Sequence, residues 1–115
     1  MVDDTFKEFV LDQLSTLSEL RAKAMFGGYG LYSGERFFAI LFDGRLYFKV
    51  DKTNRAAYLD RDAKPFTYII KDGRTLAMTY YEVPPEILED SKELIGWATR
   101  SIAIASTSTQ KRRSS

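Results

Sequence analysis

The pattern of apolar and polar positions is clearest between residues 25 and 50, where glycines separate runs rich in aromatic residues. This pattern predicts three consecutive strands joined by two tight turns. The run Phe37–Phe42 holds six apolar residues between Gly34 and Asp43. We therefore expect it to be the central strand of a sheet, buried on both faces. Asp43-Gly44 fits a type I′ hairpin turn, which needs positive φ at both central positions.

Beyond that turn, apolar residues alternate with more polar ones. Leu46, Phe48 and Val50 occupy one set of positions, and Tyr47 and Lys49 occupy the other. Because successive strand side chains point to opposite faces, this predicts one core face and one face that meets solvent or a partner.

The N-terminal segment has the periodicity of an amphipathic helix over residues 3–20. Its apolar stripe consists of Phe6, Val10, Leu14 and Leu17, widened by Phe9 and Leu20. Thr5 and Glu8 have the spacing of a capping box at the helix start. We expect this helix to cover one face of the sheet.

The second half of the chain predicts two more strands and further helices. A short helix is expected from residues 51–55 to Leu59, and strands over 66–70 and 74–81 flank the hairpin signal Asp72-Gly73. Pro84-Pro85 favours a helix start. The spacing of Asp90 and Glu93 predicts a break near Asp90, followed by a longer helix to about residue 105.

The order helix, three strands, helix, two strands, helix indicates an α+β two-layer sandwich with a mostly antiparallel five-stranded sheet. Residues 1–105 are expected to form one domain. Residues 106–115 are rich in Ser and Thr and contain Lys111-Arg112-Arg113, which predicts a disordered basic tail.

Composition limits the chemistry of the chain. The 115 residues contain neither cysteine nor histidine, which excludes thiolate nucleophiles, disulfides and the commonest metal ligand and general base. We therefore expect a non-enzymatic protein without metal or cofactor. The sequence shows neither a long apolar run nor a secretory signal, so we expect a cytoplasmic protein.

The net charge of +1 hides an uneven distribution. Residues 21–81 hold eleven Lys and Arg against six Asp and Glu, whereas residues 1–20 hold one Lys against five acids. The sheet region could therefore meet an anionic partner, or its bases could simply keep strand edges soluble. The candidate surface residues are Arg21, Lys23, Tyr29, Tyr32, Arg36, Arg45, Tyr47 and Lys49.

Two other motifs have alternative interpretations. Gly27, Gly28 and Gly30 could form a phosphate loop, but they lead into a strand rather than a helix, which favours a bulge or kink. Asp60-Arg61-Asp62 could hold a metal ion, although two carboxylates in a polar loop are typical of a solvated turn.

Several motifs together resemble the N-terminal domain of the TfoX/Sxy competence-regulator family. The first runs from Arg21 and Lys23 through residues 25–32 to Asp51, and the second covers Tyr80-Tyr81-Glu82-Val83-Pro84 and Leu94 to Ala98. The residues that carry the resemblance and are expected to serve the fold are Met25, Phe26, Gly27, Gly28, Gly30, Asp43, Gly44, Tyr80, Tyr81, Pro84 and Trp97.

The resemblance implies a fold similar to secretion-chaperone-like domains, with the terminal helices on one face of the sheet. It also implies a stand-alone version without the C-terminal helical domain of the two-domain regulators. The function expected from it is a regulatory or protein-interaction module in competence gene expression, with a protein partner such as the transcription machinery. The alternative is direct, weak nucleic-acid binding by the basic aromatic sheet region. A homodimer is a further possibility, because it would hide an uncovered face or edge of the sheet.

Overall fold

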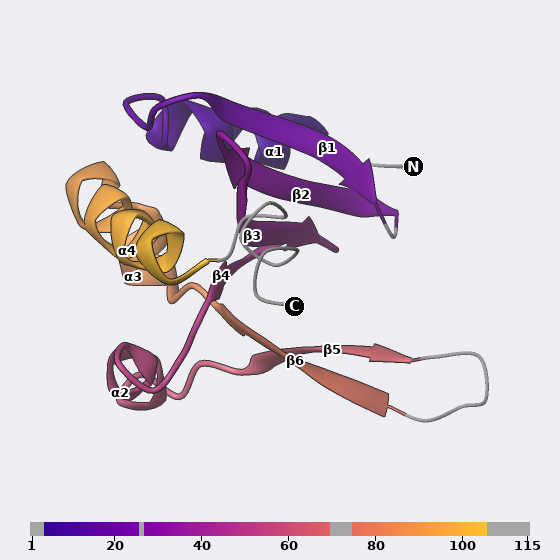
Figure 1. The fold of residues 1–115 in the computed structure, drawn as a ribbon, viewed down its shortest axis with the longest axis vertical. Coiled ribbons are helices and arrows are strands. Elements are labelled where there is room, and N and C mark those ends of the chain that lie inside the picture. Colours follow the sequence, from indigo (N-terminus) through magenta and orange to yellow (C-terminus); the bar gives the residue numbers. More distant parts are fainter. Residues whose placement is uncertain (1–3, 26, 70–74, 106–115) are drawn as a thin grey trace, which may run out of the picture.

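A six-stranded antiparallel sheet organises the chain, which we describe from a computed structural model for residues 4–25, 27–69 and 75–105 (Figure 1). The strands lie in the order β1-β2-β3-β4-β6-β5. Their bounds are β1 Leu20–Met25, β2 Gly28–Ser33, β3 Arg36–Phe42, β4 Arg45–Lys49, β5 Pro65–Ile69 and β6 Thr75–Glu82. The helices are α1 Asp4–Gln13, α2 Arg55–Leu59, α3 Pro85–Leu88 and α4 Ser91–Ile104.

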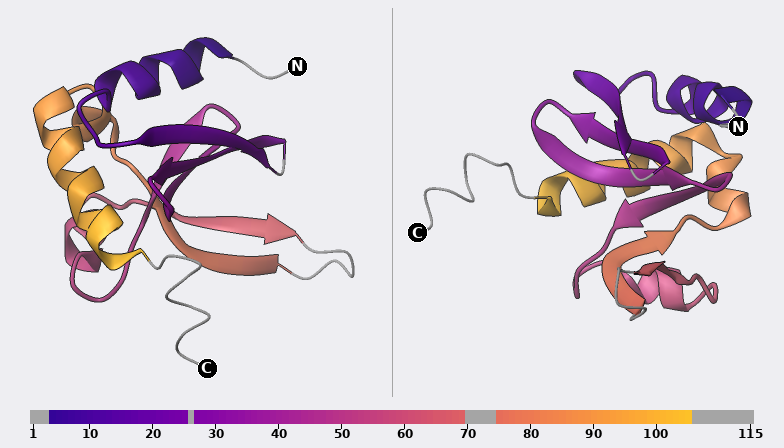
Figure 2. Two further views of the ribbon diagram at one scale, coloured as in Figure 1. Left: turned by 45° about the horizontal axis from the view of Figure 1, so that its top comes forward. Right: turned by 90° about the vertical axis from the view of Figure 1, so that its right-hand side faces the viewer.

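The helices and one face of the sheet enclose the main core. Val10 and Leu14 from the N-terminal segment and Leu94 from α4 are fully buried against sheet residues such as Leu31 and Phe48. In Figure 1, α3 and α4 lie together on one side of β3 and β4. The rings of Tyr58 in α2 and Trp97 in α4 lie 4.7 Å apart, and the left view of Figure 2 shows these two helices. The predicted α+β class with the terminal helices on one face is confirmed, with a sheet of six strands instead of five.

The opposite face of the sheet carries a second, smaller cluster, and we call this side the helix-free face, because its described cluster residues all come from strands. The β5–β6 hairpin swings away from β1 and β2, so the sheet is strongly curled (Figure 1). Phe66 of β5 meets the ring of Tyr47 edge-on, with centroids 5.0 Å apart. Tyr47 is only 8% exposed, so the second face of β4 is partly covered, which the alternation along that strand did not predict.

The central strand and its turn follow the prediction. Phe38, Ala39, Ile40 and Leu41 are buried, and β3 has a neighbour on each side. A change of register between β2 and β3 places a bulge beside residues 31 and 32. Asp43 and Gly44 have φ values of 55° and 70°, as a type I′ turn requires.

The break between the last two helices is also confirmed. Pro84 is the N-cap of α3 and Pro85 follows it at the first helical position, where a missing N–H costs nothing. The Asp90 carboxylate then accepts a hydrogen bond from the backbone N–H of Glu93 at 3.2 Å. This cap starts α4.

The N-terminal helix is shorter than the apolar stripe predicted. It ends at Gln13, residues 14–19 form turns, and Glu19 has a positive φ of 51° that redirects the chain into β1. The turns contain Ser15, Thr16 and Ser18, whose side chains compete for backbone hydrogen bonds. Strand β1 was not predicted, because its alanines and bases have weak strand propensity. Pairing with β2 overrides that preference.

Other boundaries differ by a few residues or lie outside the described chain. Helix α2 begins at Arg55, after a turn in which the Asp51 carboxylate accepts from the N–H and hydroxyl of Thr53. Strands β5 and β6 pair antiparallel as expected. Asp72-Gly73, Phe26 and the tail of residues 106–115 fall outside the described residues. Among the described residues, no helix is both long enough and apolar enough to cross a membrane.

Candidate functional site

Four basic residues of the sheet region lie on the helix-free face. Arg21 is paired across β1 and β2 with Tyr32, and Lys49 is paired across β4 and β6 with Tyr80. Residues paired directly in antiparallel strands project to the same face, and so do residues two apart in one strand. Lys23 therefore shares the face of Arg21, and Arg45 shares the face of Lys49.

A stack of aromatic rings crosses this face between Arg21 and Lys49. The ring of Phe37 stacks on Tyr32, with centroids 5.1 Å apart and planes 24° from parallel, and also contacts Tyr80 at 5.4 Å. The Arg21 guanidinium lies 5.2 Å from the Tyr32 centroid, and the Lys49 ammonium lies 5.2 Å from the Tyr80 centroid. The stack thus has a cation at each end, in the geometry of a cation–π contact.

Hydrogen bonds hold both cations in place. Nη2 of Arg21 donates to the carbonyl oxygen of Gly34 at 2.9 Å, and Nζ of Lys49 donates to Oγ1 of Thr79 at 2.9 Å. Each group uses only part of its donor capacity in this way. The remaining N–H groups are available to an acceptor that approaches the face.

Three of the four bases on this face lack an ion pair among the described residues. Arg45 has carboxylate oxygens of Asp43 at 3.8 Å and of Glu82 at 3.6 Å from its guanidinium. By contrast, Arg21, Lys23 and Lys49 form no ion pair with a carboxylate of the described residues. The Asp51 carboxylate, whose pKa is lowered mainly by its hydrogen bonds from Thr53, also lies near Lys49. Among the described residues, the charge of these three bases is therefore only partly compensated.

Three of the eight predicted surface residues serve other purposes. Tyr47 is buried, and burial together with the nearby Glu82 carboxylate raises its pKa. Tyr29 packs against the main core, under the ammonium of Lys7 at 4.6 Å. Arg36 points toward α4, so its place is on the helix side of the sheet.

Arg36 closes the C-terminal end of α4. Its Nη1 donates to the carbonyl oxygens of Ile102 at 3.1 Å, Ala103 at 3.5 Å and Ala105 at 2.7 Å. The last carbonyls of a helix have no partner within the helix and carry a partial negative charge. A guanidinium satisfies them, which explains why this base is unavailable to a partner although its strand position resembled the others.

A comparison with known protein families matches residues 12–105 to the TfoX N-terminal domain. The chain belongs to the TfoX N-terminal domain family. This confirms the resemblance seen in the sequence motifs. A comparison with curated proteins found no match.

The glycines of the TfoX motif serve backbone geometry. Gly27 has φ +81°, and Gly28 lies so close to the Leu41 carbonyl that a Cβ there would overlap its oxygen. A side chain at Gly30 would collide with the sulfur of Met25 and the ring of Phe37. The loop leads directly into β2, which leaves no helix start for a phosphate.

The second TfoX motif contributes to the packing around α2. The ring of Tyr58 lies 6.0 Å from that of Tyr81 and 4.7 Å from that of Trp97. Pro84 is buried at the start of α3. Within the described residues, no group of three acidic or other ligating side chains could hold a metal ion, and Asp60 and Asp62 are both exposed.

Sequence reasoning missed Phe37 as the residue that joins the two tyrosines. It was assigned to a strand buried on both sides, and the bulge beside it turns its ring toward Tyr32 and Tyr80. The bases at Arg21 and Lys23 were the only signal in the sequence for this site. The pairing of β1 with β2, which places Arg21 opposite Tyr32, follows from the structure and not from the sequence pattern.

Proposed function

We propose that this domain is a non-enzymatic regulatory module that binds an acidic segment of a protein partner through its helix-free face. In this proposal it acts in the cytoplasm, in the control of competence genes or genes regulated similarly, together with the transcription machinery. Membership of the TfoX N-terminal domain family supports a regulatory role.

The observation that carries the proposal is the arrangement of Arg21, Lys23 and Lys49. They lie on one face, have no carboxylate partner among the described residues, and surround a partly exposed aromatic stack. Unbalanced charge of one sign on a surface attracts a partner of the opposite sign and orients its approach. Carboxylates on alternate residues of an extended acidic segment would lie on one side of it, as Arg21 and Lys23 lie on one face of β1.

The chemistry of the face supports binding more than catalysis. Burial raises the pKa of Tyr80, and its hydroxyl donates to the carbonyl oxygen of Phe37 at 3.3 Å. Such a phenol remains protonated at neutral pH and is a poor general base. The sequence contains no histidine or cysteine to replace it.

Direct nucleic-acid binding is the second candidate, because the same bases could contact phosphates. Binding of single strands also depends on aromatic faces on which bases can stack. Here the ring of Phe37 stacks on Tyr32, and cations cover Tyr32 and Tyr80. The ring faces are therefore engaged within the protein, which favours a peptide partner over nucleic acid.

A second copy of the chain is a weaker candidate for this face. Two copies meeting through it would bring Arg21, Lys23 and Lys49 of each close to the same bases of the other. Like charges brought together oppose association. The proposal therefore assigns the face to a different, acidic molecule.

The test compares two triple variants by titration with a defined probe. The probe is a short synthetic peptide that alternates Asp and Glu with Leu and Phe, and the control peptide has Lys in place of the acids. One variant combines R21Q, K23Q and K49Q on the face, and the matched control combines K52Q, R55Q and K92Q at exposed positions elsewhere. Both variants lose one Arg and two Lys.

We expect the face variant to bind the acidic peptide about tenfold more weakly than the unmodified protein, because each of three surface charges contributes up to roughly 1 kcal/mol. The control variant should bind normally, and both variants should remain folded; the face variant loses some stability because Arg21 and Lys49 each make a hydrogen bond and a cation–π contact. Equal affinities of the two variants would refute the proposed face. Tighter binding of a duplex or single-stranded oligonucleotide than of the peptide, lost in the face variant, would assign the face to nucleic acid instead.

A further inference from the structure

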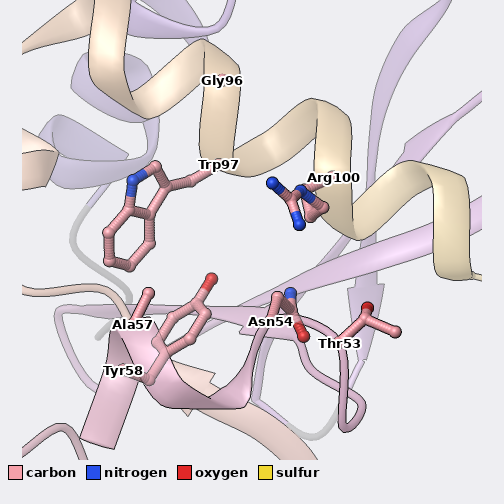
Figure 3. Close-up of a pocket in the computed structure, with 7 residues that line it drawn as sticks. All are labelled: Thr53, Asn54, Ala57, Tyr58, Gly96, Trp97 and Arg100. Atoms are coloured by element: carbon pink, nitrogen blue, oxygen red, sulfur yellow. The ribbon is translucent and has the colours of Figure 1, made fainter. Parts of the chain in front are cut away.

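A cleft of about 450 Å³ lies between α2 and α4, on the helix side of the molecule and away from the helix-free face (Figure 3). Its volume is in the range of sites that hold small molecules. The residues that line it are Thr53, Asn54, Ala57, Tyr58, Gly96, Trp97 and Arg100.

Among the described residues, the hydroxyl of Tyr58 at the floor of the cleft has no hydrogen-bond partner. Tyr58 is 1% exposed, and its oxygen forms no hydrogen bond with any described residue. Burial raises the pKa of Tyr58, and the nearby Ser101 hydroxyl offsets this only in part. That hydroxyl donates to the carbonyl oxygen of Lys49 at 2.8 Å and does not meet the hydroxyl of Tyr58 in bonding geometry. Buried polar groups are almost always paired, so this one indicates a missing partner.

Arg100 supplies a cation to the same space. Its side chain is exposed and forms no ion pair with a carboxylate of the described residues. In Figure 3 its guanidinium and the Tyr58 hydroxyl both point toward the gap between the two helices. A covered hydroxyl becomes reachable when a side chain beside it moves, and a long exposed arginine can change rotamer.

The cleft has apolar as well as polar walls, and one position of its lining is a glycine. The Trp97 ring forms one side, held by its contacts with Tyr58 at 4.7 Å and with the Arg61 guanidinium at 5.3 Å. Gly96 lies within α4, and a Cβ there would meet no atom within 4 Å. Glycine inside a helix is less stable than alanine, yet alanine would fit, so the glycine keeps space open at a cost in stability.

We propose that this cleft binds a small organic anion that has a carboxylate and an apolar, ring-sized body. The carboxylate accepts hydrogen bonds from the Arg100 guanidinium and the Tyr58 hydroxyl, and the apolar body lies along Trp97 and Ala57. Thr53 and Asn54 contribute shape, because their polar groups already bond to Asp51 and Lys49. The site shares no residue with the helix-free face, so the two proposals stand or fall separately.

Trp97 is the single tryptophan of the chain, so its fluorescence reports on the cleft directly. The full chain is titrated with phenylacetate, with phenylacetamide as the neutral analogue and acetate as the anion without a ring. We expect saturable quenching by phenylacetate with a Kd of about 1 mM or below, and at least tenfold weaker responses to the other two. A linear response to phenylacetate, or an equal response to the amide, would overturn the proposal.

Variants then test each feature of the cleft. R100Q should weaken phenylacetate binding about tenfold with an unchanged melting temperature, because an exposed cation is removed. Its control, K92Q, removes a base from the same helix outside the cleft and should bind normally. G96L should abolish binding by filling the space, and G96A should raise the melting temperature.

Y58F separates a ligand role from a structural one. An unpaired buried hydroxyl contributes nothing to folding, so its removal should leave the melting temperature equal or higher while binding weakens. A lower melting temperature with unchanged binding would show that the hydroxyl is satisfied within the protein. That result would remove the floor of the proposed site and overturn the assignment.

Discussion

Lys49 holds its ammonium nitrogen 5.2 Å above the centre of the Tyr80 ring, and the two residues are directly paired across β4 and β6. The base is thus kept on the sheet by a ring and by the Thr79 hydroxyl, and it forms no ion pair with a carboxylate of the described residues. A cation held in this way keeps its charge available to an approaching anion. The arrangement also requires Tyr80 to stay buried and neutral beneath it.

The buried tyrosines predict a loss of stability at high pH. Burial is the main cause that raises the pKa of Tyr47, Tyr58 and Tyr80 above the ordinary value of 10.0. Because the folded-state pKa exceeds the unfolded one, this contribution to stability is complete below pH 10 and is lost as the pH rises above it. Tyrosinate absorbance should show these three residues ionising together with unfolding. Ionisation of all seven tyrosines at the ordinary pH in a folded protein would contradict the structure.

Arg36 is predicted to stabilise the fold rather than a complex. R36M keeps the apolar stem but removes the donors to the last carbonyls of α4, so the free energy of unfolding should fall by about 2 kcal/mol. Urea denaturation measures this change. R55M, at an exposed position of α2, should change stability by less than about 0.5 kcal/mol. A stable R36M variant that loses affinity for the acidic peptide would return Arg36 to the binding surface.

Gly28 is predicted to be required because of a close approach. A Cβ at this position would overlap the Leu41 carbonyl oxygen, so G28A should destabilise by about 3 kcal/mol. Gly44 has φ +70° but open space around it, and G44A should cost only about 1 kcal/mol of conformational strain. Equal thermal stability of G28A and the unmodified protein would show that β2 and β3 can separate there without loss.

Deletion of the basic tail, residues 106–115, is predicted to change nucleic-acid binding and to leave thermal stability unchanged. Residues 1–105 carry fourteen Lys and Arg against sixteen acids, and Lys111, Arg112 and Arg113 bring the chain to +1. Deletion of residues 106–115 should weaken any nonspecific binding to duplex DNA, and each lost phosphate contact should lower the salt slope by about 0.9. The melting temperature should not change, because the segment has no apolar residues to bury. Equal DNA affinity with and without it would exclude the tail from nucleic-acid binding.

The parts of the fold that the sequence predicts are those set by local chemistry. Asp43 and Gly44 adopt positive φ as their turn type requires, and Asp90 caps α4 through the N–H of Glu93. In both cases neighbouring residues determine the geometry. The helix boundary at Gln13 was missed because Leu14 and Leu17 continue the apolar stripe through turns that still pack on the core.

The candidate site depended on pairing that no local pattern encodes. Arg36 and Arg45 both follow tight turns, yet one caps a helix sixty residues or more away along the chain and the other lies on the helix-free face. Tyr47 was expected to be accessible, and the curl of the sheet brings Phe66 over it. Long-range contacts of this kind determine the face of the sheet on which a base or ring lies. The sequence could therefore identify the candidate residues, but it could not show which of them lie on the helix-free face.

The most direct test of the proposed interaction maps the bound surface by amide chemical shifts in a titration with the acidic peptide. We expect the largest changes along β1, at Tyr32 and around Lys49, while the amides of α4 remain unchanged. The triple variant R21Q/K23Q/K49Q should lose these changes at the same peptide concentration. Changes confined to the helices, or the same changes in the triple variant, would contradict binding through the helix-free face.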